Sequence, residues 1–189
     1  GAYRGYRDVL QDIMGITPLD PGYTRQWLLE VLSRESAAGL CPRGWNPIKG
    51  TLDNRQYRDS PCWIPLTLSA YLRESGEMGL LDEQVPYADG SRGSVFDHAL
   101  IALRRLFADR GQQGLCLIGD GDWNDSLNEV ALEGRGQSAW LTIATVHAMR
   151  VLAEIAGAGG REGEADELRR MASQLSDQVN RAAWDGKWY

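Results

Sequence analysis

The residues best suited to chemistry lie in one short segment, LCLIGDGDWNDSLNEV, residues 115–130. Seven consecutive positions, 119–125, hold three carboxylates, an amide, an indole and two glycines. Cleavage of a glycosidic bond needs a carboxylic acid that protonates the leaving oxygen. Like-charge repulsion raises the pKa of one member of a carboxyl pair, so it can stay protonated near neutral pH. Asp122 and Asp125 would form such a pair if the loop closes into a helical turn.

A calcium-binding loop and a helix cap are two other interpretations of this segment. Residues 120–124 match the start of a calcium-binding loop, but its sixth position should be Gly and is Asp125, and its twelfth should be Glu and is Ala131. Alternatively, one polar side chain of the segment caps a helix over 126–132. Capping needs a single such residue and gives Trp123 no role, so acid catalysis on a sugar explains more of the composition.

Composition limits the classes of function. The chain has 189 residues, a net charge of −6 and a pI near 5.0, which argues against a nucleic-acid-binding face. No apolar run in the sequence approaches the roughly 18–20 residues that span a bilayer, so no membrane partner is expected. Three isolated cysteines and only two histidines predict no metal site, and reduced thiols suggest a cytoplasmic protein.

The elements that must position this segment are helices. Apolar spacing predicts helices over 6–16, 24–39, 59–76, 94–111, 138–156 and 160–184. The helix over 59–76 requires Pro65 to lie in its first turn, and residues 40–58 form a long loop. No strand alternation is evident, so the chain is predicted to be all-α. Alternating buried and amphipathic helices with long aromatic loops favour an α/α barrel over a helical bundle, whose loops are shorter.

Aromatic residues are mostly Trp and Tyr, which pair an apolar face with a polar group and suit sugar binding. Trp27, Trp63 and Trp140 lie on apolar helical stripes and are predicted to be core residues. Trp45, in the long loop, is a candidate for stacking on an acceptor sugar.

The chain also resembles a known family. GDGDWNDSLN resembles the GDWND motif of the inverting β-glycoside phosphorylases of glycoside hydrolase family 94, which include cellobiose, chitobiose and β-1,2-oligoglucan phosphorylases and a domain of cyclic β-1,2-glucan synthases. YRGYRDVLQDIMGI resembles the family's G-[FY]-R-D-x-x-Q-D segment, and YRDSPCWIPLTLSAYLRESG its D-[DS]-x-x-W-[IL]-P helix. LLDEQVPY, GRGQSAW and AWDGKWY follow in the family's order. Gln137 departs from the family's frequent Glu. The resemblance leans toward the β-1,2-glucan branch.

This resemblance implies an (α/α)6 barrel, of which the chain is an N-terminal fragment, with residues 1–189 as a partial catalytic domain. It implies that Asp125 is the general acid. It also implies a sugar-binding set: Arg7, Asp8, Asp12, Asp59, Asp122 and Trp123.

The reaction that the resemblance implies is inverting phosphorolysis of a β-linked glucose oligosaccharide. Inorganic phosphate attacks the anomeric carbon opposite Asp125, Asp125 protonates the leaving oxygen, and α-glucose 1-phosphate forms. Phosphate is a co-substrate, no cofactor is needed, and the family's phosphate ligands lie beyond residue 189. The full-length protein is expected to form a homodimer. Three alternatives are a processing domain of a cyclic β-1,2-glucan synthase, an inverting hydrolase with a second carboxylate, and a non-catalytic carbohydrate-binding relative.

Overall fold

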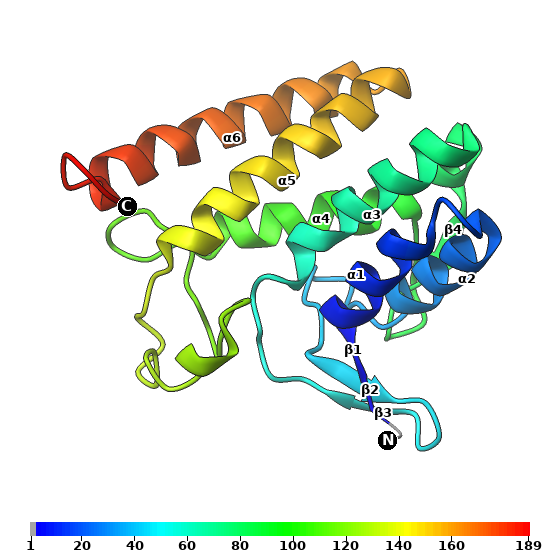
Figure 1. Cartoon of the computed structure of the whole chain (residues 1–189), viewed down its shortest axis with the longest axis horizontal. Helices are drawn as coiled ribbons and strands as arrows, with labels where there is room; N and C mark the ends of the chain where they lie inside the picture. The colour runs from blue at the N-terminus through cyan, green and yellow to red at the C-terminus, as the bar shows by residue number, and fades with distance from the viewer. Residues whose placement is uncertain (1–2) are drawn as a thin grey trace.

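The structure is a computed structural model that describes residues 3–189 (Figure 1). Within these residues the chain is mostly helical, as predicted. The six α-helices are α1 (Tyr6–Ile16), α2 (Pro21–Leu32), α3 (Ser60–Ser75), α4 (Val95–Ala108), α5 (Ala139–Ala158) and α6 (Glu162–Ala183). Two short 3-10 helices, η1 (Met78–Asp82) and η2 (Asp125–Leu127), lie in the connections.

The helices alternate in direction along the chain. In Figure 1, α1, α3 and α5 run the same way, and α2, α4 and α6 return. The closest pairing is between the long helices α5 and α6. As a result, the N-terminal ends of α1, α3 and α5 open toward one side of the molecule. The loop that follows α4 and a small sheet lie on that same side (Figure 1).

The prediction that the chain contains no strands is wrong in detail. β1 (Arg4–Gly5), β2 (Gly44–Asn46) and β3 (Thr51–Asp53) form an antiparallel sheet, and β4 (Gln84–Pro86) pairs with β5 (Arg92–Ser94). Each strand has only two or three residues. Strands this short are not long enough to show a period-2 pattern in the sequence. The sheet matters because it fixes the start of α1 against the predicted long loop.

The second predicted helix, 24–39, lies over Pro21–Leu32 instead. Asp20 caps its N-terminus by accepting a hydrogen bond from a backbone amide of the first turn, and Pro21 takes the first helical position. Beyond Leu32 the chain turns so that Glu35 enters the core. Gly39 has φ +75° and packs so close to α4 that a Cβ would lie 2.6 Å from the Ile101 carbonyl oxygen.

Pro65 lies inside α3 and not in its first turn, contrary to the prediction. The helix begins at Ser60, which places Pro65 in the second turn. Proline has no N–H, so it gives no backbone hydrogen bond to the carbonyl four residues earlier. Burial of the apolar face of α3, which includes Ile64 and Leu68, offsets this loss.

The tryptophans divide differently from the prediction. Trp45 is buried, with 1% of its surface exposed, so the hypothesis that it stacks on an acceptor sugar is wrong. Trp27 and Trp63 are half-buried against the core. Trp140, at the start of α5, is 43% exposed, contrary to its prediction as a core residue.

Helix α5 also corrects the expectation about membrane-length segments. Over Ala139–Ala158 it is long and apolar enough to cross a bilayer by length and composition alone, with 56% of that window buried inside the protein. Core helices of soluble proteins pass the same test. One face of α5, with Ile143 and His147, is exposed in this chain.

Candidate active site

The candidate site begins at the first turn of α1. The amide of Tyr6 donates to the carbonyl of Arg43 at 2.9 Å, which ties the start of the helix to the residue just before β2. Gly5, in extended conformation, precedes the helix. A Cβ at Gly5 would lie 2.0 Å from a carboxylate oxygen of Asp8. Glycine therefore leaves the room that Asp8 occupies at this helix end.

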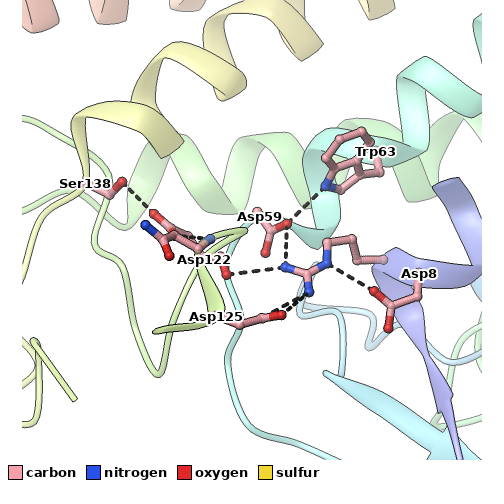
Figure 2. A network of polar contacts seen from close by, with 8 residues as sticks. Asp8, Asp59, Trp63, Asp122, Asp125 and Ser138 are labelled. Atoms are coloured by element: carbon pink, nitrogen blue, oxygen red, sulfur yellow. Dashed lines mark hydrogen bonds and ion pairs between the residues drawn. The ribbon is translucent and has the colours of Figure 1, made fainter. Parts of the chain in front are cut away.

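Arg7 is the centre of a network of polar contacts, and the aspartates that it contacts are labelled in Figure 2. Its Nη1 donates to Asp59 Oδ2 and to the carbonyl of Asp122, both at 3.3 Å. Its Nη2 contacts both carboxylate oxygens of Asp125 at 3.1 and 3.2 Å, and its Nε contacts Asp8 Oδ1 at 3.3 Å. The side chain of Arg7 is only 14% exposed. A simple surface ion pair between Arg7 and Asp8 therefore does not describe this arrangement.

The charged groups of Arg7 and Asp59 are largely shielded from water, which shifts their pKa values. Burial lowers the pKa of Arg7, but the carboxylates of Asp59 and Asp125 outweigh it, so the net shift is upward. Asp59 precedes α3, and its side chain is fully buried. Burial raises the pKa of Asp59, opposed by Arg7 and by a hydrogen bond from Trp63. The guanidinium therefore stays charged, and the buried carboxylate depends on its few donors.

The loop over 119–125 is held against residues 56–58. The backbone N–H of Gln56 donates to Asp120 Oδ2 at 2.6 Å, and the backbone N–H of Arg58 donates to the carbonyl of Gly121 at 2.9 Å. A Cβ at Gly121 would lie 2.9 Å from the ring of Tyr57. Gly119, Asp120 and Gly121, at the start of the loop, therefore hold it against residues 56–58.

Asp122 and Asp125 do not form the predicted carboxyl pair. Asp122 is buried, and its carboxylate accepts from Ser138 Oγ at 2.7 Å and from the backbone N–H of Asn124 at 2.9 Å. Asp125 points instead to Arg7 (Figure 2). The predicted capped helix over 126–132 is also wrong, since only the single turn η2 forms there. Asp122 shapes the loop, and Asp125 is presented at the surface.

An aromatic pair flanks the loop. The rings of Trp123 and Trp140 stack with centroids 6.0 Å apart at an interplanar angle of 25°. Both side chains are about half exposed. Ser138 and Trp140 both lie at the N-terminal end of α5, so this helix end contacts the loop at two points. The pair offers an apolar face of the kind that packs on sugar rings.

A small cavity of about 100 Å³ lies beside Asp125. Its lining includes Arg7, Asp8, Ser60, Tyr57 and Arg43, together with Tyr3 and Gly5. The guanidinium of Arg43 lies 4.4 Å from the ring centroid of Tyr57. Arg43 is half-buried and forms no ion pair with a carboxylate within residues 3–189.

Other features lie apart from this centre. Asp12 is exposed one turn further along α1 and takes no part in the contacts around Arg7. A larger groove of about 440 Å³ lies between α2 and β4 and borders none of the predicted site residues. Within the described residues, no cluster of three or more His, Cys, Asp or Glu side chains could hold a metal ion.

Gln137, where the family often has Glu, is turned toward residues 113–115. Its Oε1 accepts from the amides of Gln113 at 3.1 Å and Leu115 at 3.2 Å. A carboxylate could accept the same two hydrogen bonds. In this chain the side chain therefore supports the loop that leads into 119–125.

The structure thus brings together five of the seven residues predicted for the site, namely Arg7, Asp8, Asp59, Asp122 and Asp125. Trp123 lies on the same loop as Asp122 and Asp125, stacked on Trp140. Sequence reasoning missed Arg43, Tyr57 and Ser138 and assigned Trp63 to the core. Their residue types are common in loops and helix ends, so spacing alone carried no signal for them. The arrangement can bind hydroxyl groups through charged donors and acceptors and can present one carboxyl to a bound ligand.

The chain matches one family of known proteins along its length. A family model described as the glycosyl hydrolase 94 superfamily, catalytic domain, matches residues 1–189. The chain is 43% identical to a solabiose phosphorylase of Paenibacillus borealis over 187 aligned residues. This alignment covers 98% of the chain and 24% of that protein.

Two further relatives match along nearly the whole chain. A 3-O-beta-D-glucopyranosyl-beta-D-glucuronide phosphorylase of Paenibacillus borealis is 34% identical over 193 residues, covering all of the chain and 25% of that protein. A cellobionic acid phosphorylase of Neurospora crassa is 34% identical over 187 residues, covering 97% of the chain and 24% of that protein. The chain therefore spans about a quarter of the length of these relatives.

Proposed function

Because the chain belongs to the glycosyl hydrolase 94 superfamily, we propose that the protein carrying it is an inverting phosphorylase of β-linked glucosides, with Asp125 as the general acid. The observation that supports this proposal most is the position of Arg7. It links α1, the start of α3 and the loop of Asp125 through four carboxylate or carbonyl groups. Arginine with several carboxylates is a suitable set for binding sugar hydroxyls in fixed positions.

The proposed mechanism follows from the exposure of the groups. The side chain of Asp125 is 58% exposed, and that of Asp8 is 61% exposed, so both can reach a ligand in the cavity. A glucosyl unit binds with its hydroxyl groups on Arg7 and Asp8 and its ring beside Trp123. Asp125 protonates the leaving oxygen while phosphate attacks the anomeric carbon from the opposite face. Because phosphate is itself a nucleophile, no second carboxylate base is needed.

Both oxygens of Asp125 accept hydrogen bonds from Arg7. The carboxyl can donate a proton only after this contact is released or shared. We infer that a sugar hydroxyl takes up part of the hydrogen bonding of Arg7 when substrate binds. The contact would then prevent proton transfer in the absence of substrate.

Several further properties belong to the same proposal. Residues 1–189 form the first part of an α/α-barrel catalytic domain, of which residues 1 and 2 lie outside the described residues, and the phosphate ligands come from later parts of the protein. The alternating directions of the six helices support the barrel. Three buried free thiols support a cytoplasmic protein. The homodimer stays a prediction for the longer protein.

The substrate is proposed only as a class. The relatives carry names for phosphorylases of solabiose, of a glucosyl glucuronide and of cellobionic acid. The three names differ from one another and therefore indicate no single acceptor. We therefore propose a β-glucosyl donor and leave β-1,2-oligoglucans and cellobiose in the panel beside the acceptors named for the relatives.

The test uses the longer protein that carries this chain. It is incubated with inorganic phosphate and a panel of solabiose, cellobiose, cellobionic acid, a glucosyl glucuronide and β-1,2-oligoglucans, and α-glucose 1-phosphate is assayed. Phosphate-dependent release that Asp125→Asn abolishes is the expected result. Release of glucose without phosphate would identify a hydrolase, and specific binding without any product would identify a carbohydrate-binding relative.

A further inference from the structure

Trp63 lies on α3, one helical turn after Asp59, and its indole is directed to that carboxylate. The Nε1 of Trp63 donates to Asp59 Oδ2 at 3.0 Å (Figure 2). Its apolar stripe predicted a core residue, and the ring is indeed half-buried against the core. The polar end of the ring, however, contacts the candidate site.

Asp59 has few groups that stabilise its charge. Its side chain is 0% exposed, so water does not solvate it directly. Oδ2 accepts from Trp63 at 3.0 Å and from Arg7 at 3.3 Å, and Oδ1 has no hydrogen-bond partner within residues 3–189. A buried carboxylate is costly unless hydrogen bonds and an opposite charge support it. Among residues 3–189, Trp63 is therefore one of two side chains that donate to this carboxylate.

We propose that Trp63 is a positioning residue for the reaction: its indole N–H holds Asp59, Asp59 holds Arg7, and Arg7 holds Asp125 and its loop. This inference rests on the proposed function, because it assigns a role within the same site. Trp63 does not line the cavity beside Asp125, so it acts on the sugar and the acid through Asp59 and Arg7.

The physical reason is the limited support of the buried charge. Removal of the indole N–H leaves Asp59 with Arg7 as its one donor, which favours the neutral carboxyl. A neutral carboxyl binds a guanidinium more weakly. Arg7 can then shift toward the exposed Asp8 and away from Asp59, and its contacts to the loop of Asp125 lose their fixed geometry. Small misplacements of catalytic groups have large effects on rate.

Trp45 provides a matched control. It packs in the core as Trp63 does, though more deeply, and its Nε1 has no hydrogen-bond partner in the described part of the chain. Trp63→Phe and Trp45→Phe both remove an indole N–H and shrink an aromatic side chain. Only the first breaks a hydrogen bond to the site. A difference in kcat/KM between the two variants therefore measures the effect of that hydrogen bond and not of the smaller ring.

The experiment is a double-mutant cycle in the longer protein that carries this chain. Trp63→Phe should lower kcat/KM by about tenfold, mostly through kcat, because the hydrogen bond is made to a charged group. Trp45→Phe should change kcat/KM less than about threefold. In an Asp59→Asn background, Trp63→Phe should cause no further loss, since the group it acts through has already been replaced.

A pH profile gives a second readout. The charged and titratable groups around Asp59 are Arg7 on α1, the thiol of Cys62 on α3 and the thiol of Cys41 before β2. The thiols stay neutral at acidic pH, because burial raises their pKa values. The acidic limb of kcat/KM should therefore move to higher pH in Trp63→Phe and stay unchanged in Trp45→Phe.

A crystal structure of Trp63→Phe tests the proposal without turnover. Separation of Arg7 from Asp59 is expected, and retention of the wild-type contacts of Arg7 to Asp59 and Asp125 would overturn the positioning role. Additive losses in the cycle would overturn it as well. Absence of phosphate-dependent product from the wild-type protein would instead contradict the proposed function, and the structural comparison would still decide the role of Trp63.

Discussion

Both carboxylate oxygens of Asp125 accept hydrogen bonds from Arg7 Nη2, at 3.1 and 3.2 Å. The same guanidinium contacts the buried Asp59 and the backbone carbonyl of Asp122 through Nη1. A single side chain of α1 thus connects α3 to the loop that carries the proposed acid. The consequences of this relationship can be tested at several residues.

Arg7→Lys should lower kcat/KM for phosphorolysis by roughly 100-fold. A lysine keeps the positive charge but cannot contact Asp59, Asp122 and Asp125 from separate nitrogens, so the loop loses its orientation. Steady-state kinetics of the longer protein check this prediction. Arg104→Lys is the matched control, because Arg104 forms a two-contact pair with Glu167 at 2.8 and 2.6 Å between α4 and α6. Equal kinetics for the two variants would refute the proposed role of Arg7.

Ser138→Ala should loosen the loop over 119–125. It removes the hydrogen bond to buried Asp122 and the N-terminal cap of α5, where Ser138 Oγ accepts from the amide of Leu141 at 3.0 Å. Loss of the cap alone costs about 1 kcal/mol. Hydrogen exchange of residues 119–127 should accelerate. Ser138→Thr keeps the hydroxyl and should restore protection, and slow exchange in the alanine variant would contradict this account.

Arg43→Gln should raise the KM for the sugar by roughly tenfold and leave the KM for phosphate nearly unchanged. Arg43 lines the cavity beside Asp125 and lacks a carboxylate partner in the described residues, so its guanidinium is available to a bound sugar hydroxyl. Initial rates with each substrate varied separately check this. A change confined to the KM for phosphate would assign Arg43 to the other substrate.

The buried pair of Glu35 and His98 predicts a pH-dependent stability. Glu35 Oε2 lies 2.9 Å from His98 Nδ1, and both side chains are fully buried. Burial raises the pKa of Glu35 to about 7, with the hydrogen bond and charge of His98 opposing the shift. A raised pKa in the folded state favours the protonated form. Its stabilisation is present below the ordinary value of 4.5 and is lost as pH rises through about 7.

The amide of Ala88 donates to the carbonyl of Glu35 at 2.8 Å. Amide exchange in the hairpin of β4 and β5 should therefore respond to the ionisation of Glu35. Hydrogen exchange over 84–98, corrected for intrinsic rates, should show protection that falls between pH 5.5 and 7.5. Across this pH window the difference can reach about 2 kcal/mol as an upper bound, from roughly 1.4 kcal/mol for each pKa unit between pH 5.5 and about 7. Glu35→Gln should remove most of this pH dependence, and an unchanged dependence in that variant would contradict the assignment to Glu35.

The sequence by itself determined the helical character of the chain, the approximate position of each helix and the segment that carries the proposed acid. Periodic burial leaves a direct record in the spacing of apolar residues, as in α1, where Tyr6, Val9, Leu10 and Ile13 are buried. Motif resemblance added the family and the candidates Arg7, Asp59 and Asp125. The end of α2 was misplaced, because Glu35 turns inward to meet His98, 63 positions away.

Only the tertiary structure decided which of these residues meet. Arg7 contacts Asp59 across 52 positions and Asp125 across 118, and no local pattern specifies such pairings. The structure also separated Asp122 from Asp125 and turned the polar edge of Trp63 to the site. Helical periodicity tells which face of an element is buried, whereas the partner of a polar group depends on how distant elements pack, and that packing places Arg7 between the two carboxylates.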